Sequence, residues 1–462
     1  MKRDIRLFCM LTILMALLAS LGCGGTGDAK QDSAVRPSLD AALETDEPDG
    51  MAASAPTPTA TPAPTPEPTP TPTPLLTEYT VENGTTWARL EQILQENPAL
   101  RRLDLRESGL DIREHPAILA ALDMELLFKA ELCGAEVTEA TEIFAPLTAP
   151  EEWDLETLKL LKSLRSIDLT GAACEPEQIQ LVREWFPEQE VLWKLELCGQ
   201  EVGPDTESLN YNDQPIESLE PFYRTLPLLT KLTALEMCGC GVGNEEMDAL
   251  RTAFPQAGIV WSIKSKYWTV RTDADHFATW RVVRTDENGL ILEAYSISFN
   301  TNEDMDWLQY CHDLVALDVG HNKLTNCEFV RNMPNLVYLI IADNRISDLS
   351  PISTLSKLKY LEIFANPVTD LAPLSGLSEL LDINMCGCYI SDLSPLYGLP
   401  QLERVWMTPY NLSDFRAAAE AFQEALPNCT LQYINSKDFT GLGWRRHPRY
   451  EEYRLALGRA KP

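Results

Sequence analysis

The sequence is poor in positive charge, and this shortage limits the partners that it can bind. Its 462 residues include 38 Lys and Arg against 69 Asp and Glu, which gives a formal net charge of −31 at pH 7. No stripe rich in Lys and Arg interrupts the acidity, so the phosphate backbone of a nucleic acid would be repelled. We therefore expect no nucleic acid among its partners.

Motifs of catalysis and metal binding are also missing. The five histidines show no H-E-x-x-H spacing, and the chain contains no G-x-S-x-G and no calcium loop of the D-x-D-x-D-G type. CGCGVG at 238–243 lacks the complete G-x-G-x-x-G of a dinucleotide loop. The sequence thus predicts no catalytic residue, no cofactor and no metal, and hence a protein that is not an enzyme.

Two closely spaced cysteine pairs look at first like metal clamps. They are Cys238 with Cys240, and Cys386 with Cys388. In the repeat described below, Cys386 falls on the outward side of a strand and Cys388 on an inward position, so we expect their thiols to diverge. We interpret the cysteines as small buried residues with a few exposed thiols. A disulfide stays open outside the cytoplasm, whereas a zinc site is not expected.

Long apolar runs are limited to one, at the N-terminus. Lys2, Arg3 and Arg6 precede an apolar stretch from 7 to 18 that is too short for a comfortable bilayer span, as in an export signal. The SLGC that follows resembles a bacterial lipoprotein signal, although Ser20 stands where Leu is usual. The resemblance implies removal of 1–22, lipid on Cys23 and an extracytoplasmic protein whose only membrane attachment is this lipid. A plain secretory signal or an uncleaved anchor stays open.

Residues 23–78 contain almost nothing that could form a core. They are rich in Gly, Asp, Ser and Ala, and then in Pro and Thr, as in PTPTATPAPTPEPTPTPTP. Such a composition cannot offset its ordering entropy and favours extended polyproline II. We expect a disordered stalk.

The rest of the chain is repetitive. Similar stretches open every 22 residues, at Leu314, Leu336, Leu358, Leu380 and Leu402. Each follows the pattern L-x-x-L-x-L-x-x-N-x-L, in which alternation indicates a short strand. One unit is too small to bury its apolar face alone, so neighbouring coils must stack.

The asparagine of the pattern has a structural reason. Its amide can satisfy backbone groups of its own coil and of a neighbouring coil where the chain turns inward after the strand. The residues at this position are Asn322, Asn344 and Asn366, followed by Cys388 and Tyr410. We expect a ladder that weakens toward the C-terminus.

These stretches resemble the leucine-rich repeats of internalin-like bacterial surface proteins, which also carry the "IsDLsPLxxL" motif. The resemblance implies an α/β solenoid, a leucine-rich repeat array with parallel strands on its concave face, for 273–412. One coil upstream, Leu292, Tyr295, Ile297 and Asn300 hold the same register.

Residues 79–272 show a longer period. LRRLDLRESGL at Leu100, LRSIDLTGAAC at Leu164 and LTALEMCGCGV at Leu232 resemble one another, and Phe128, Trp193 and Trp261 keep step with them. Two helical stretches, 175–187 and 244–255, end in Phe-Pro. We interpret this part as an irregular N-terminal extension of the same array.

The last segment, 413–462, repeats a helix and a strand and then becomes basic and aromatic. We interpret it as a cap over the open last coil, because exposed strand edges aggregate. A separate binding tail around Trp444 and Arg445 is the alternative.

Residues between the buried positions should point out from the strands and line the concave face. The candidate ligand-binding residues are Tyr338, Tyr360, Glu362, Phe364, Asp382, Asn384, Arg404 and Trp406. Aromatics with polar neighbours are typical of interaction surfaces. We therefore predict that replacing Tyr360 and Trp406 abolishes ligand capture and leaves stability nearly unchanged.

Two functions remain open at this stage. The first is adhesion or recognition at the cell surface by a lipoprotein without catalytic activity, with a host protein, an envelope protein or a polysaccharide as ligand. The second is a solenoid that targets a wall-modifying or hydrolytic enzyme. The missing catalytic motifs favour the first.

Overall fold

The computed structural model describes residues 76–435, 439–440 and 443–459. The predicted signal sequence, the predicted lipid on Cys23 and residues 23–75 of the predicted stalk therefore lie outside the described residues. None of the helices in the described part has both the length and the apolar character that crossing a membrane requires.

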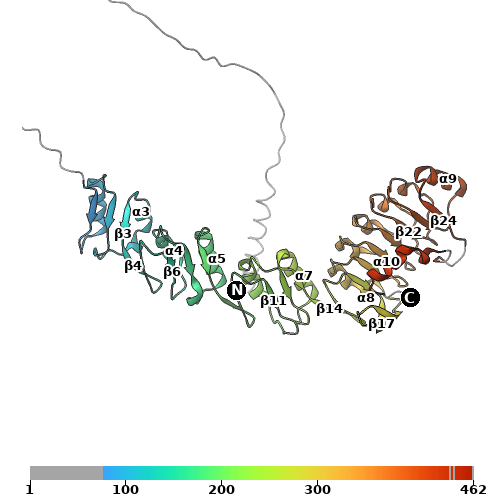
Figure 1. Cartoon of the computed structure of the whole chain (residues 1–462), viewed down its shortest axis with the longest axis horizontal. Coiled ribbons are helices and arrows are strands. Elements are labelled where there is room, and N and C mark those ends of the chain that lie inside the picture. Colours follow the sequence, from blue (N-terminus) through green and yellow to red (C-terminus); the bar gives the residue numbers. More distant parts are fainter. Residues whose placement is uncertain (1–75, 436–438, 441–442, 460–462) are drawn as a thin grey trace, which may run out of the picture. The chain divides into compact units, whose positions relative to one another are not determined.

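Residues 78–271 form three modules of the same design (Figure 1, blue to green). Each module has three short strands in a parallel sheet, two helices between them, and then an antiparallel pair of strands. The first contains β1 (Glu78–Thr80), α2 (Trp87–Glu96), β2 (Arg102–Asp104), α3 (Pro116–Ala120), β3 (Glu125–Leu127), β4 (Lys129–Leu132) and β5 (Ala135–Thr138). The second contains β6 (Ile143–Phe144), α4 (Glu152–Leu158), β7 (Ser166–Asp168), α5 (Pro176–Trp185), β8 (Glu190–Leu192), β9 (Leu195–Leu197) and β10 (Gln200–Val202). The third contains β11 (Ser208–Asn210), α6 (Glu220–Thr225), β12 (Ala234–Glu236), α7 (Asn244–Ala253), β13 (Ile259–Val260), β14 (Ser262–Lys264) and β15 (Thr269–Arg271).

The two helices that the sequence predicts before Phe-Pro are confirmed as α5 and α7. Each ends just before the phenylalanine, Phe186 or Phe254, because the proline that follows disfavours helical geometry in the residue before it. Phe128, Trp193 and Trp261 follow the third strand of their modules, and all three are buried. The long period seen in the sequence is thus one module.

Sharp turns close the first two antiparallel pairs. Cys133 and Gly134 have φ of 49° and 77°, and Cys198 and Gly199 have φ of 47° and 86°. Two successive residues with positive φ give the turn that best matches the twist of a two-residue hairpin. The repeated Leu-Cys-Gly sequences are therefore turns.

The C-terminal part is built on a seven-stranded parallel sheet. Neighbouring strands from β19 to β23 pair 22 residues apart, as Tyr338 with Tyr360 and Tyr360 with Asp382. The strands, in sheet order, are β16 (His276–Ala278), β19 (Ala316–Asp318), β20 (Tyr338–Ile340), β21 (Tyr360–Glu362), β22 (Asp382–Met385), β23 (Arg404–Met407) and β24 (Thr430–Tyr433). The helical returns between them are α8 (Asn302–Met305), η5 (Asp306–Tyr310), η6 (Glu328–Asn332), η7 (Ser350–Thr354), η8 (Ala372–Leu374), η9 (Ser394–Leu396) and α9 (Phe415–Ala425).

The Asp-Leu-x-Pro motif starts three of these returns. Asp348, Asp370 and Asp392 each accept a hydrogen bond from the backbone N–H two residues on, at 2.8 Å. The proline that follows lies in the first turn, where its fixed φ suits a helix and no N–H is needed.

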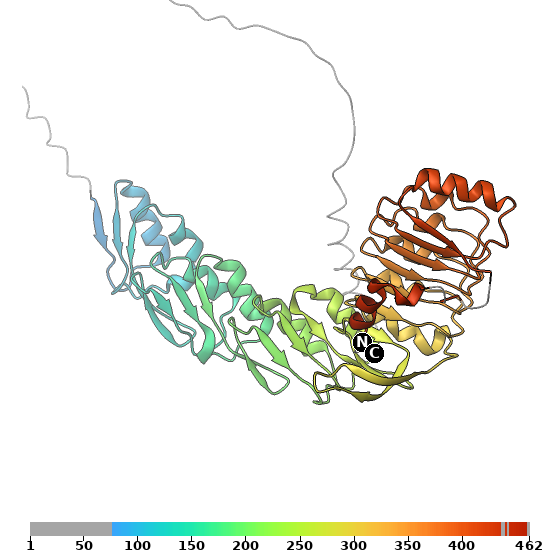
Figure 2. The ribbon, with the colours of Figure 1, turned by 45° about the vertical axis from the view of Figure 1, so that its right-hand side comes forward.

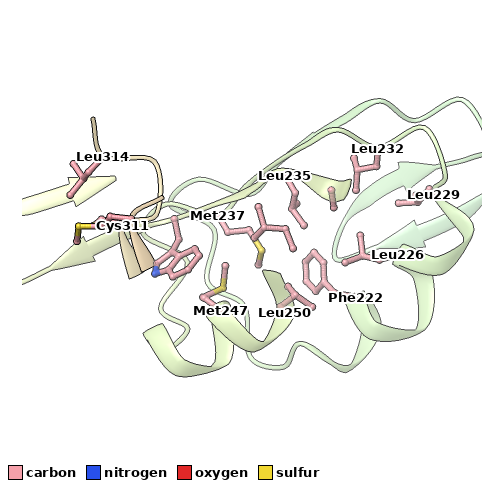
Figure 3. Packing of buried hydrophobic residues seen from close by; sticks show 14 of the residues in the cluster. Phe222, Leu226, Leu229, Leu232, Leu235, Met237, Met247, Leu250, Cys311 and Leu314 are labelled. Atoms are coloured by element: carbon pink, nitrogen blue, oxygen red, sulfur yellow. The ribbon is translucent and has the colours of Figure 1, made fainter. Parts of the chain in front are cut away.

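One cluster of buried residues runs along the described chain from Val81 to Cys429. Figure 3 shows a part of this main core that extends from Phe222, Met247 and Leu250 of the third module to Cys311 and Leu314 beyond it. In each strand from β19 to β23, the second residue enters the main core, and the residues on either side of it point to the opposite face. These second residues are Leu317, Leu339, Leu361, Ile383 and Val405.

The expected coil upstream of Leu314 is placed differently. Its strand is β16, whereas Leu292 and Tyr295 lie on β18 (Ile291–Ser296), which pairs antiparallel with β17 (Trp280–Thr285). Both side chains are exposed, at 43% and 52%. An inserted hairpin thus separates the strand from its asparagine, and only Asn300 keeps the expected role.

The asparagine ladder is confirmed through Asn366. The Nδ2 of Asn344 donates to the carbonyl oxygens of Val319, Ile341 and Ala342 at 3.0–3.2 Å, and its Oδ1 accepts from the backbone N–H of Leu324 at 3.0 Å. Asn366 repeats this pattern, with Ile341, Ile363 and Phe364 as acceptors. Cys388 continues it with its thiol on the Ile363 carbonyl. Tyr410 at the next position is 67% exposed, so the ladder weakens toward the C-terminus as expected.

We expect Asn344→Ala to destabilise the fold by about 1–3 kcal/mol, because several buried backbone groups would lose their partner. Arg345→Ala is the matched control, since this neighbouring side chain is exposed. Asp343 is unsuitable as a control because its φ is +50°, where alanine is itself strained. Urea unfolding measures both variants, and equal losses would contradict the ladder.

Candidate functional site

The C-terminal residues 443–459, which we call the tail, pack against one face of the seven-stranded sheet. The tail contains η10 (Trp444–Arg446) and α10 (Pro448–Ala456). Figures 1 and 2 both show α10 (red) beside the strands. We call the covered side, which carries the outward residues of β19 to β23, the tail face. Tail and face share a second buried cluster, which includes Ala316, Ile340, Tyr360, Phe364, Cys386, Trp406, Trp444, Tyr453 and Leu457.

Aromatic rings form the centre of this contact. The indole of Trp444 is fully buried between Tyr360 and Trp406, with ring centroids 5.5 and 5.3 Å away. Tyr453 stacks on Tyr360 at 5.3 Å and 10°. The Arg404 guanidinium lies over the Trp444 ring at 4.5 Å, where the negative face of the ring attracts it. The tail thus fills the aromatic part of the face.

A charge pair fixes the tail on β22. Arg449 of the tail binds both oxygens of Asp382, with Nε–Oδ2 at 2.6 Å and Nη2–Oδ1 at 2.8 Å. Arg404 of the sheet adds a third bond, Nε–Oδ1 at 2.7 Å. Burial alone would raise the pKa of Asp382, but the hydrogen bonds from Arg404 and Arg449 hold it below its ordinary value. Asp382 is therefore a charged group at neutral pH.

Two further acids of the face accept hydrogen bonds from the tail. Glu362 is fully buried and accepts from the Trp444 indole at 2.7 Å and from the Tyr360 hydroxyl, with Arg445 at 3.4 Å. Asp318 accepts from the Tyr453 hydroxyl at 2.9 Å. Burial is the main cause that raises the pKa of Asp318, and the nearby Glu362 charge adds to it.

The structure brings all the predicted face residues together, but it covers them. Tyr360 and Trp406 are only 1% and 5% exposed. Phe364 packs against Phe439 at 6.0 Å, and Asn384 donates to the Phe439 carbonyl oxygen at 2.9 Å. The other members, Tyr338, Glu362, Asp382 and Arg404, lie on the same face and are half-buried or buried. Whether they bind an external ligand stays a prediction.

Two expectations from the sequence are wrong here. The tail lies across the face of the sheet, with contacts to β19, β21 and β22, and is not a lid over the last coil. Tyr360 and Trp406 are buried by that contact, so their joint replacement should weaken tail docking instead of leaving stability unchanged. Arg449 and Tyr453 were missed as members of the site. The signal for them was a basic, aromatic end in an acidic chain with acids at outward strand positions.

The cysteines give no bridge and no metal centre in this part of the chain. The ten described cysteines are free thiols, and no group of three or more His, Cys, Asp or Glu side chains among the described residues could hold a metal ion. The divergence of Cys386 and Cys388 is confirmed, because Cys386 lies in the tail-face cluster and Cys388 in the main core. Burial raises the pKa of the Cys388 thiol to about 12, so it is unreactive.

We expect Asp318→Asn to stabilise the protein at pH 7. A carboxyl with a raised pKa stabilises most when it is protonated, and that contribution is lost as the pH rises through its folded value. The groups that face Asp318 are Tyr453, Glu362 and Arg445. The amide mimics the protonated acid, so the variant should keep this contribution. Thermal unfolding should show the gain vanishing below the ordinary pKa of 3.8. A variant that is less stable at pH 7 would contradict the assignment.

The sequence matches one family model. Residues 334–376, which span β20 and β21, match the family described as Leucine Rich repeats (2 copies). The strands, ladder and Asp-Leu-x-Pro returns of this stretch are therefore those of leucine-rich repeats. No curated protein matches the chain.

Solved structures give distant matches. An internalin (inlF) of Listeria monocytogenes is 18% identical, with 74% of this chain and 70% of that chain covered, at a TM-score of 0.26. Internalin C2 of the same organism is 18% identical, with 70% and 92% covered, at 0.26. A leucine-rich repeat protein of Leptospira interrogans is 14% identical, with 78% and 90% covered, at 0.24. At such TM-scores these matches carry no argument on function.

Proposed function

We propose that this protein is an internalin-like recognition lipoprotein with a solenoid of leucine-rich repeats, which binds a protein ligand outside the cytoplasm without catalysing a reaction. One observation supports the binding role above the others. The tail face holds a segment of polypeptide, residues 443–459, by aromatic packing and charge-assisted hydrogen bonds. A surface that accommodates one such segment has the chemistry to recognise a protein, and this favours a protein over a polysaccharide as ligand.

The test is capture by a soluble chain that begins at residue 76, immobilised at its N-terminus, from envelope and host extracellular protein fractions. Tyr338 is half-buried at the tail face, so part of its ring is accessible beside Tyr453. Tyr338→Ala should weaken capture at least 10-fold, the effect expected of an aromatic anchor. Tyr389→Ala is the matched control, because Tyr389 is exposed outside the strands. Equal capture by all three proteins would refute this role for the face, and retention of glycans alone would replace the protein ligand by a polysaccharide.

The anchor is part of the proposal and has its own test. The Gly22-Cys23 that ends the apolar run supports lipid attachment to Cys23 at the cell membrane, with the Pro/Thr-rich segment as a spacer. Mass spectrometry of the mature N-terminus should find a diacylated or triacylated Cys23. Cys23→Ser should move the protein from the membrane fraction to the soluble fraction, and an unmodified N-terminus elsewhere would end the idea.

A further inference from the structure

The tail packs in a cluster separate from the main core. Its buried residues Trp444, Tyr453 and Leu457 all belong to the tail-face cluster. Among the described residues, none beyond Tyr433 contributes to the main core, which lies on the opposite side of the sheet. The coils therefore keep their apolar interior and their asparagine ladder when the tail leaves.

The contact between tail and face has the composition of a recognition site. The face offers three acids, Asp318, Glu362 and Asp382. The tail meets them with a phenol, an indole and two guanidiniums, the last from Arg445 and Arg449. Buried ion pairs contribute little net stability, since desolvation offsets their attraction, but they discriminate strongly against partners without the matching charge. We expect the three acids to regain their hydration when the tail leaves. Opening the face would therefore leave no unpaired charge buried.

Besides its contacts with the face, the described part of the tail is connected at its two ends, and neither connection is part of the coils. It is joined to β24 by residues 434–442 of the chain. At its far end, the Ile291 N–H of the inserted hairpin donates to the Gly458 carbonyl oxygen at 2.7 Å. The Arg459 guanidinium lies over the Trp280 ring at 4.5 Å. This end contact involves a hairpin that lies outside the parallel sheet, so its release costs no strand pairing in the sheet.

We propose that the tail is a resident, exchangeable ligand of its own face, and that the protein partner displaces it with a segment rich in arginine and aromatic residues. This inference depends on the proposed role of the face in binding protein. It adds the chemistry of the partner: an indole N–H for Glu362, a guanidinium for Asp382 and a phenol for Asp318. Because the tail belongs to the same chain, it competes with any partner at a high effective concentration. Only a partner segment that offers a donor to each of the three acids should displace it.

The proposal is tested by competition in the complete soluble chain from residue 76. The probe is a fluorescent synthetic peptide with the sequence of residues 443–459. Its anisotropy should report binding at least 10-fold tighter to the Trp444→Ala chain than to the wild type, because the altered tail no longer competes. A peptide in which both Trp444 and Arg449 are replaced by alanine should not bind either chain.

Three results would overturn the proposal. The peptide could fail to bind the Trp444→Ala chain although its circular dichroism is native, or that chain could lose its fold altogether. In the wild type, hydrogen exchange could show tail amides as strongly protected as those of β20 to β22, which would make the tail a fixed part of the structure. No external ligand enters these measurements, so a failed capture experiment leaves them valid. Binding of the peptide without capture would mean that the face serves only the tail.

Discussion

Trp444→Ala is expected to detach the tail from the sheet at a cost of about 3–5 kcal/mol of docking free energy, the range for removing a buried tryptophan side chain. The indole fills the space between Tyr360 and Trp406 and is fully buried. Its loss also removes the N–H donor of Glu362. The measurement is hydrogen exchange of peptides that cover residues 444–457, together with limited proteolysis of the tail.

Two control variants separate the contributions. Trp153→Ala changes an indole that is 47% exposed and should alter stability by less than about 0.5 kcal/mol. Trp444→Phe keeps an aromatic ring and removes the hydrogen bond to the buried Glu362 carboxyl, so it should cost about 1–3 kcal/mol. If Trp444→Ala leaves the exchange of the tail as slow as in the wild type, the aromatic contact does not hold it.

The coil structure could be predicted from the sequence because each local signal repeats. Leucine spacing, the asparagine and the Asp-Leu-x-Pro return recur with one period, and the observed register of β19 to β23 follows it. Each coil faces the same constraint, since a buried strand end needs a partner for its carbonyl groups. Asn344 and Asn366 could therefore be placed from their position alone.

The covering of the face could not be predicted in the same way. Outward strand positions alternate with buried ones whether they face water or another segment, so periodicity carries no information about Tyr360 or Trp406 being covered. Glu362 and Asp382 were expected to be exposed because charged side chains at outward strand positions normally face water. Their burial depends on Trp444 and Arg449, which lie 82 and 67 residues further on. The link is a long-range complementarity of charge that no local pattern contains.

The inserted hairpin shows a second limit. β16 and β19 pair directly although their first residues, His276 and Ala316, are 40 positions apart. The extra residues form β17 and β18. The pattern of β18 led us to place the strand of the upstream coil at Leu292 instead of in β16. An insertion of alternating residues resembles a strand of the sheet, because both have period two. Only the buried Asn300 marks the true coil.

Acids at outward strand positions explain why a basic segment covers this face. Asp318, Glu362 and Asp382 come from three strands within four successive positions of the sheet. The chain has a net charge of −31, so few other basic side chains compete with the tail for these three acids. The tail therefore supplies the positive charge that the acids share. Specific geometry then depends on the bidentate bond between Arg449 and Asp382, which a lysine could not reproduce.

The second large effect is expected from Asp382→Ala. Asp382 is fully buried and is bound by Arg404 from the sheet and by Arg449 from the tail. Its removal leaves two guanidiniums close together without their shared anion, and breaking a buried ion pair on one side costs about 3–5 kcal/mol. We expect the tail to exchange and to be cleaved as fast as in Trp444→Ala, which urea unfolding and hydrogen exchange would measure.

Glu403→Ala provides the matched control for this charge pair. Glu403 binds the same Arg449 side chain at 2.6 Å, but it is 56% exposed, so its loss should cost no more than about 1 kcal/mol. The wild type should lose the same tail contact in acid. A carboxyl with a lowered pKa stabilises above its ordinary value of 3.8, and this contribution disappears as the pH falls through the folded value. If Glu403→Ala releases the tail as fully as Asp382→Ala, then docking depends on general attraction between the basic tail and nearby acids, and not on the buried bidentate bond between Arg449 and Asp382.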